Sequence, residues 1–110
     1  MTYVLLRHRV EDYERWRPYF DGHGVMHAKS GALGGRVFRT SSDPNDIWIL
    51  FEWDSEENAR RFISSADLKN TMREAGVIDT PDVYFLSELE KPNIRLDVRI
   101  EEPTAVTTPA

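Results

Sequence analysis

Two histidines four residues apart are the first feature of the sequence that could carry chemistry. His23 and His27 would lie on one face of a helix, and His8 could supply a third imidazole. Three imidazoles with an open coordination position can hold zinc or non-haem iron. However, Gly22 and Gly24 disfavour a regular helix here, and no carboxylate has an evident place beside the pair. We therefore predict polar, partly exposed histidines near a helix end, and no metal site.

A second feature is a set of aromatic and apolar side chains that could line a ligand pocket. Such walls suit a flat aromatic or polyketide-type molecule, although the same residues would also serve as ordinary core packing. The set consists of Tyr13, Trp16, Phe20, Phe62 and Met72 from the expected helices, with Trp48 or Phe51 from the expected sheet. The polar side chains expected to face such a pocket are His23, His27, Arg36 and Tyr84.

Composition excludes several classes of function. The 110 residues carry a formal charge of -5, which argues against a nucleic-acid partner. The chain has no cysteine, which excludes disulfides, thiolate chemistry and cysteine-ligated zinc. No signal peptide and no apolar stretch of membrane-spanning length is visible, so we expect a cytoplasmic protein without a membrane partner. The glycines at 31, 34 and 35 lack phosphate-loop spacing and lead into a strand.

The elements that would position these residues centre on a hairpin in residues 33–53. Two runs rich in β-branched and aromatic residues flank a turn, which Asp43 and Pro44 favour. Residues 3–9 and 83–89 are predicted strands, and residues 11–29 and 54–75 are predicted helices. We expect a break in the first helix between Arg17 and Gly24. We expect Asp54 to cap the second helix, with a new cap at Ser65 where it splits.

This order of elements predicts one α+β domain over residues 1–91. Right-handed crossovers give the ferredoxin-like βαββαβ arrangement, an antiparallel sheet with two helices on one face. In residues 92–110 we expect an extra edge strand, because residues 94–100 alternate apolar with charged, and then an unstructured tail. The hairpin carries large apolar side chains on both faces, so the second face of the sheet needs a partner. A homodimer that packs sheet against sheet is the simplest solution.

Several short stretches also resemble the dimeric α+β-barrel superfamily, which includes antibiotic-biosynthesis monooxygenase-like and polyketide-cyclase-like proteins. The resemblance rests on the amino-acid sequences of residues 10–16, 43–45, 51–59, 64–68 and 75–77. It extends over roughly residues 1–90 and leaves the tail unexplained. It implies a dimeric α+β barrel with a ligand cavity between the sheet and the helices of each protomer. No catalytic set is carried over with it.

Two classes of function follow as expectations. The first is a small cofactor-independent monooxygenase- or cyclase-like enzyme acting on an aromatic or polyketide-type molecule. A histidine or tyrosine would then deprotonate or orient a phenolic substrate, and an arginine would hold the oxyanion. We expect His23, His27 and Arg36 in these roles. The alternative is a non-catalytic binding or accessory protein that uses the same pocket or only the dimer.

Overall fold

The computed structural model describes residues 2–22 and 24–93, with side chains at 24–26 left out. The predicted strand at 94–100 and the tail after it lie outside the described residues. In chain order the elements are β1 (Thr2–Arg9), α1 (Tyr13–Gly22), α2 (Gly24–Ser30), β2 (Ala32–Arg39), β3 (Asp46–Trp53), α3 (Glu56–Ile63), α4 (Ala66–Glu74) and β4 (Asp82–Ser87).

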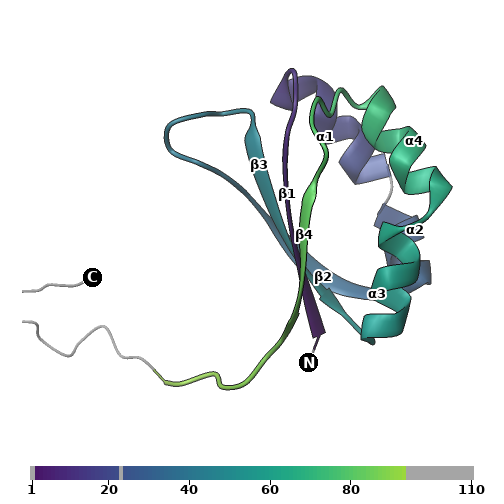
Figure 1. Cartoon of the computed structure of the whole chain (residues 1–110), viewed down its shortest axis with the longest axis vertical. Coiled ribbons are helices and arrows are strands. Elements are labelled where there is room, and N and C mark those ends of the chain that lie inside the picture. The colour runs from purple at the N-terminus through teal and green to yellow at the C-terminus, as the bar shows by residue number, and fades with distance from the viewer. Residues whose placement is uncertain (1, 23, 94–110) are drawn as a thin grey trace, which may run out of the picture.

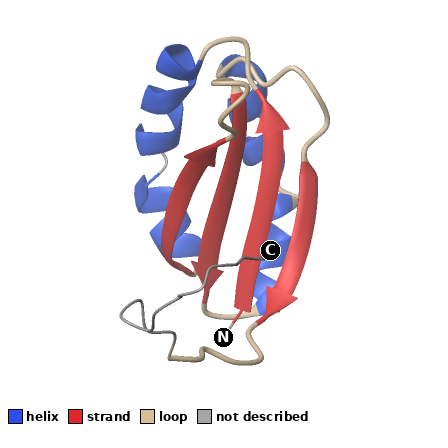
Figure 2. Ribbon diagram, turned by 90° about the vertical axis from the view of Figure 1, so that its left-hand side faces the viewer, coloured by secondary structure: helices blue, strands red, loops and turns tan. Residues whose placement is uncertain are grey.

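The four strands form one antiparallel sheet in the order β2-β3-β1-β4. All four helices cover the same face of this sheet, and its other face is left open by the described residues (Figures 1 and 2). This is the ferredoxin-like α+β arrangement predicted from the order of elements. Below, the two sides are called the helix-covered face and the open face.

The strand pattern assigns side chains to these faces as the alternation predicts. In β1, Val4, Leu6 and His8 lie on the helix-covered face, and all three are buried. The register aligns Val4 with Phe51 and Leu6 with Ile49 on the neighbouring strand. Burying each large apolar side chain stabilises the fold by about 1.5–3 kcal/mol, so this layer determines which face the helices cover.

The first predicted helical segment is described as two helices, α1 and α2. α1 ends at Gly22 and α2 begins at Gly24, and residue 23 between them, where the predicted break would fall, lies outside the described residues. The start of α1 is held from the hairpin, because the side-chain oxygen of Asn45 accepts a hydrogen bond from the Tyr13 backbone at 3.1 Å. The turn of the hairpin therefore helps to position the helix that carries Trp16 and Phe20.

The cap of α3 differs from the prediction. Ser55, rather than Asp54, is the capping residue, and its hydroxyl accepts from the Asn58 backbone at 3.1 Å. Asp54 lies one residue too early, where its carboxylate accepts from the side chain of Asn58 and fills the space beside Gly31. Gly31 has φ +117, and a Cβ there would overlap that carboxylate. The predicted second cap at Ser65 is confirmed.

Candidate functional site

A small apolar cavity lies between the sheet and the helices, with a volume of about 40 Å³. That is room for about two or three water molecules. Its walls come from β1, β3 and all four helices. Those walls include most of the side chains that the sequence proposed for a pocket: Trp16, Phe20, His27, Phe51, Phe62 and Met72.

A wider groove of about 310 Å³ lies beside the cavity, along β2. Three side chains, Phe20, His27 and Phe51, line both spaces and therefore form the wall between them. Their ring centroids are 5.4 Å apart for Phe20 and His27, 5.4 Å for His27 and Phe51, and 6.1 Å for Phe20 and Phe51. This aromatic partition controls how far the groove extends inward. Gly34 and Gly35 present no side chains on the groove side.

The rings around the cavity are ordered by contacts with one another. Trp16 stacks on Phe20 with centroids 5.0 Å apart and an interplanar angle of 20°. His27 meets Phe62 edge-on, at 5.1 Å and 83°. Such offset and edge-to-face pairs add to the stability gained by burial. The walls are therefore built from rings that hold each other in defined planes, which suits a flat ligand.

His8 is the buried titratable group of this site. Its side chain is 2% exposed, and within the described part of the chain neither ring nitrogen has a hydrogen-bond partner. Burial lowers the pKa of His8 to about 4, because the charged imidazolium loses its hydration, although Asp79 and Asp46 oppose the shift. At neutral pH the cavity therefore contains an uncharged imidazole.

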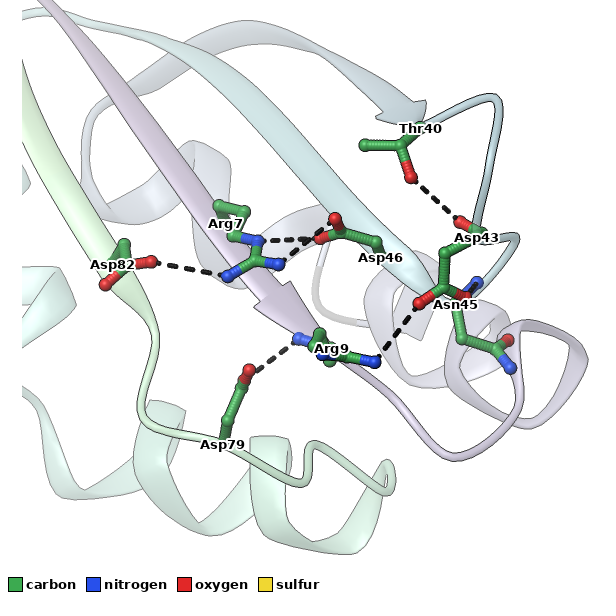
Figure 3. Close-up of polar contacts among 8 residues, drawn as sticks. All are labelled: Arg7, Arg9, Thr40, Asp43, Asn45, Asp46, Asp79 and Asp82. Carbon is green, nitrogen blue, oxygen red and sulfur yellow. Dashed lines mark hydrogen bonds and ion pairs between the residues drawn. The ribbon is translucent and has the colours of Figure 1, made fainter.

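A separate polar cluster lies at the end of β1, next to His8 along the chain (Figure 3). Arg7 donates to both carboxylate oxygens of Asp46, at 2.7 and 3.1 Å, and lies 3.6 Å from Asp82. The Arg9 backbone donates to Asp79 at 2.9 Å. The hydrogen bond from Arg7 lowers the pKa of Asp46 and the same contact raises the pKa of Arg7. The cluster ties β1 to β3 and β4 and does not line the cavity.

Four of the sequence-proposed residues lie away from the cavity. Arg36, Trp48 and Tyr84 are on the open face, because they pair in register with Leu50, Arg7 and Leu5. Tyr13 packs beside Trp16, but its ring lies under the Arg39 guanidinium at 4.6 Å and outside the cavity. The expected arginine therefore does not join the histidines in this cavity. His23 lies outside the described residues.

The sequence prediction did not place His8 in the pocket, although one signal pointed there. Strand alternation puts His8 on the same face as Val4 and Leu6, and apolar residues dominate that face. Across the described residues, no group of three histidine, aspartate or glutamate side chains is placed to hold a metal ion. The described helices are also too short or too polar to cross a membrane.

Comparisons with known proteins give no match to a family model or to a curated protein. Solved structures do match. A Bordetella bronchiseptica protein provisionally named an antibiotic biosynthesis monooxygenase has a TM-score of 0.67 at 14% identity, covering 81% of this chain and 97% of its own. SnoaB, a cofactor-independent oxygenase from Streptomyces nogalater, has a TM-score of 0.67 at 12% identity, covering 82% and 94%.

A third match is a Deinococcus radiodurans protein, also provisionally named an antibiotic biosynthesis monooxygenase. Its TM-score is 0.65 at 16% identity, with 86% of this chain and 99% of that chain covered. At such identities, the agreement concerns the backbone and not the side chains of a site. The chain therefore has the ferredoxin-like α+β fold of structures named antibiotic biosynthesis monooxygenases.

Proposed function

We propose that this chain is a small cofactor-independent enzyme of the monooxygenase- or cyclase-like kind, acting on an aromatic or polyketide-type molecule. The observation that carries the proposal is the aromatic-walled cavity with two imidazoles, His8 and His27, separated from a larger groove by the aromatic partition. The name of SnoaB, an oxygenase without a cofactor on the same fold, is consistent with it.

A ring-sized ligand needs the aromatic partition to move. Benzene-sized ligands occupy cavities of roughly 150 Å³, and the cavity has about 40 Å³. The groove beyond the partition has about 310 Å³, so rotation of Phe20 or His27 would join the two spaces into one site. The ligand would then lie with its ring between helix and sheet and extend into the groove.

His27 is the proposed proton-transfer group in this arrangement. It lines both the cavity and the groove and is only partly buried, so it can exchange protons with water and still contact a bound ring. By removing the proton of a phenolic or enolic hydroxyl, His27 would leave an electron-rich oxyanion on the substrate. That anion is the reactive species in both an oxygenation by dioxygen and an intramolecular condensation. His23, proposed on sequence grounds, keeps the same role as a proposal.

The experiment is a turnover assay with a panel of phenolic and polyketide-type compounds, in metal-free buffer. Oxygen consumption detects a monooxygenase, and mass spectrometry of the products detects a cyclase. An enzyme of the proposed kind yields a product in at least one assay, and His27→Ala abolishes it. Binding of panel members without any product would contradict the enzyme proposal.

A non-catalytic binding protein is the second candidate. One observation favours it: in the described residues no aspartate, glutamate, lysine or arginine lines the cavity. A binding site needs only shape and a few polar groups, whereas catalysis also requires charge stabilisation as the transition state forms. Occupancy without turnover in the same assay is the result that this candidate predicts.

We also propose that two copies of the chain pack through their open faces. Phe38, Tyr84 and Leu86 on that face are 50%, 52% and 42% exposed. Large apolar side chains gathered on one face of a sheet without a partner are uncommon on monomers. Native mass spectrometry measures the stoichiometry directly, and a monomer at micromolar concentration would contradict the proposal.

A further inference from the structure

His8 is a buried polar side chain for which the described fold supplies no partner. Both ring nitrogens are shielded from solvent and unpaired in residues 2–22 and 24–93. In the unfolded chain water hydrates both nitrogens, so burying them without replacement bonds destabilises the folded state. An apolar residue would avoid this loss, as Val4 and Leu6 do on the same strand face. The imidazole is therefore better explained by a group that binds to it.

The position of His8 shows where such a group would come from. The imidazole lines the cavity but not the groove, so it lies beyond the aromatic partition for anything that enters from the groove. Trp16 meets it edge-on, with centroids 5.8 Å apart and an interplanar angle of 88°. This contact holds the imidazole plane while its nitrogens remain unpaired. An entering molecule would meet apolar rings first and His8 last.

The charge of the cavity restricts what can reach His8. Among the described residues, no lysine or arginine lines the cavity, so a carboxylate there would be buried without a counter-charge. A neutral imidazole offers one donor and one acceptor. A hydroxyl group also has one donor and accepting lone pairs, and a carbonyl can accept. An uncharged ligand with such a group at one end matches both the walls and the imidazole.

We propose that His8 anchors the ligand, by a hydrogen bond from its neutral imidazole to the hydroxyl or carbonyl of an uncharged, phenol-type ring. The ring itself lies against Trp16 and Phe51. This inference rests on the proposed function for the location of the ligand, and adds its orientation and its charge class. Because burial holds the pKa of His8 near 4, His8 binds and orients the hydroxyl, and proton removal is assigned to His27.

The test uses two probes of equal shape, phenol and toluene, which differ by a hydroxyl in place of a methyl, with benzoate as the charged third probe. Backbone amide shifts in NMR titrations give their dissociation constants. In the native protein phenol and toluene bind, and benzoate is the weakest. The variant His8→Leu lowers the preference for phenol over toluene about tenfold, the effect of one neutral hydrogen bond. The variant His8→Gln, which keeps an amide donor and acceptor, retains part of the preference.

The matched control is an apolar substitution in the wall of the same cavity, Met72→Leu. It alters the wall but keeps both imidazoles, so it is expected to change the affinity of both probes alike and to leave the phenol-to-toluene ratio within about twofold. An unchanged ratio in His8→Leu, with both probes still bound, would overturn the anchor and leave the pocket intact. Failure of both probes to bind the native protein would overturn the proposed function as well. Tighter binding of benzoate than of phenol would overturn the charge class.

Discussion

Arg7 and His8 are adjacent residues of β1 that face opposite sides of the sheet, and they differ in charge, burial and hydrogen bonding. Arg7, on the open face, is charged and paired with two carboxylates, Asp46 and Asp82. His8, on the helix-covered face, is neutral, buried and without a partner in the described residues. The pairing of Arg7 is what a structural polar group shows. An unpaired buried imidazole such as His8 lowers stability, so stability alone does not explain it. Local departures from the rules of folding are most common at functional sites.

The two faces of the sheet also differ beyond these two residues. The helix-covered face has a cavity walled by ordered rings, whereas the open face has exposed apolar side chains at Phe38, Tyr84 and Leu86. We therefore propose ligand chemistry for the helix-covered face and self-association for the open face. Each prediction below tests one side of this division.

The largest expected effect is on turnover. His27→Ala should lower the rate at least 100-fold, because a positioned general base contributes roughly 10²–10⁴-fold to a rate. Arg36→Ala, on the open face, should change it less than twofold. Steady-state assays of both variants with the same substrate provide the comparison. Equal losses at the two positions would contradict the assignment of chemistry to the helix-covered face.

The second prediction concerns the pH dependence of stability. The pKa of His8 is about 4 in the folded protein and 6.5 for an exposed histidine, as in the unfolded chain. Between these values the unfolded chain binds the extra proton, so the free energy of unfolding falls as pH is lowered from about 6.5 to 4. One pKa unit corresponds to 1.36 kcal/mol, which makes the loss about 3 kcal/mol. Urea denaturation at a series of pH values measures it.

The control for that series is His8→Leu. This variant should lose the dependence between pH 6.5 and 4, and it should be more stable than the native protein at pH 5, because no buried imidazole has to remain unprotonated. Asp46 contributes at lower pH, since its pKa is lowered by Arg7 and its stabilisation is lost only as pH falls through that lowered value. An unchanged slope in His8→Leu would assign the effect to another group.

Sequence patterns predict which residues of one strand share a face better than they predict which residues of neighbouring strands lie side by side. Alternation within β1 places Val4, Leu6 and His8 on one face, because the direction of a side chain in a strand depends only on whether its position is odd or even. Grouping Arg36 with the cavity required the register between β2 and β3, and that register shifts at an irregularity between Ala32 and Gly34. A one-residue shift moves every side chain to the other face. The sequence does not specify such a shift.

The helix signals differ in how far the sequence alone can decide them. Gly22 and Gly24 indicate a break in the first helix, and it stays a prediction because residue 23 lies outside the described residues. Asp54 and Ser55 are both good capping residues, and only tertiary structure distinguishes them, since the Asp54 backbone donates to Gly31 at 2.9 Å and its carboxylate covers that glycine. The grouping of Trp16, Phe20 and Phe62, in contrast, followed from apolar residues at helical spacing, and all three line the cavity.

The third prediction addresses the open face. Leu86→Glu should raise the dimer dissociation constant at least tenfold, because it buries a charge in the proposed interface. The control Ile78→Glu replaces a side chain that is 58% exposed and follows α4, outside the strands. Analytical ultracentrifugation of both variants measures the difference. Equal dissociation constants for Leu86→Glu and the native protein would mean that the open face is not the interface.

The smallest effect on stability is expected from the ion pair between Arg7 and Asp46. Asp46→Asn keeps the shape of the side chain but removes the charge that Arg7 contacts at 2.7 Å. Part of this pair is exposed to solvent, and exposed ion pairs contribute little to stability, so the free energy of unfolding at neutral pH, measured by urea denaturation, should fall slightly. The decrease should shrink at high salt, since screening weakens the native pair and leaves the variant unaffected. A loss of unfolding free energy larger than the pH-dependent loss assigned to His8 would reverse the comparison between the two residues. The stability of this end of the sheet would then depend more on the paired arginine than on the unpaired histidine.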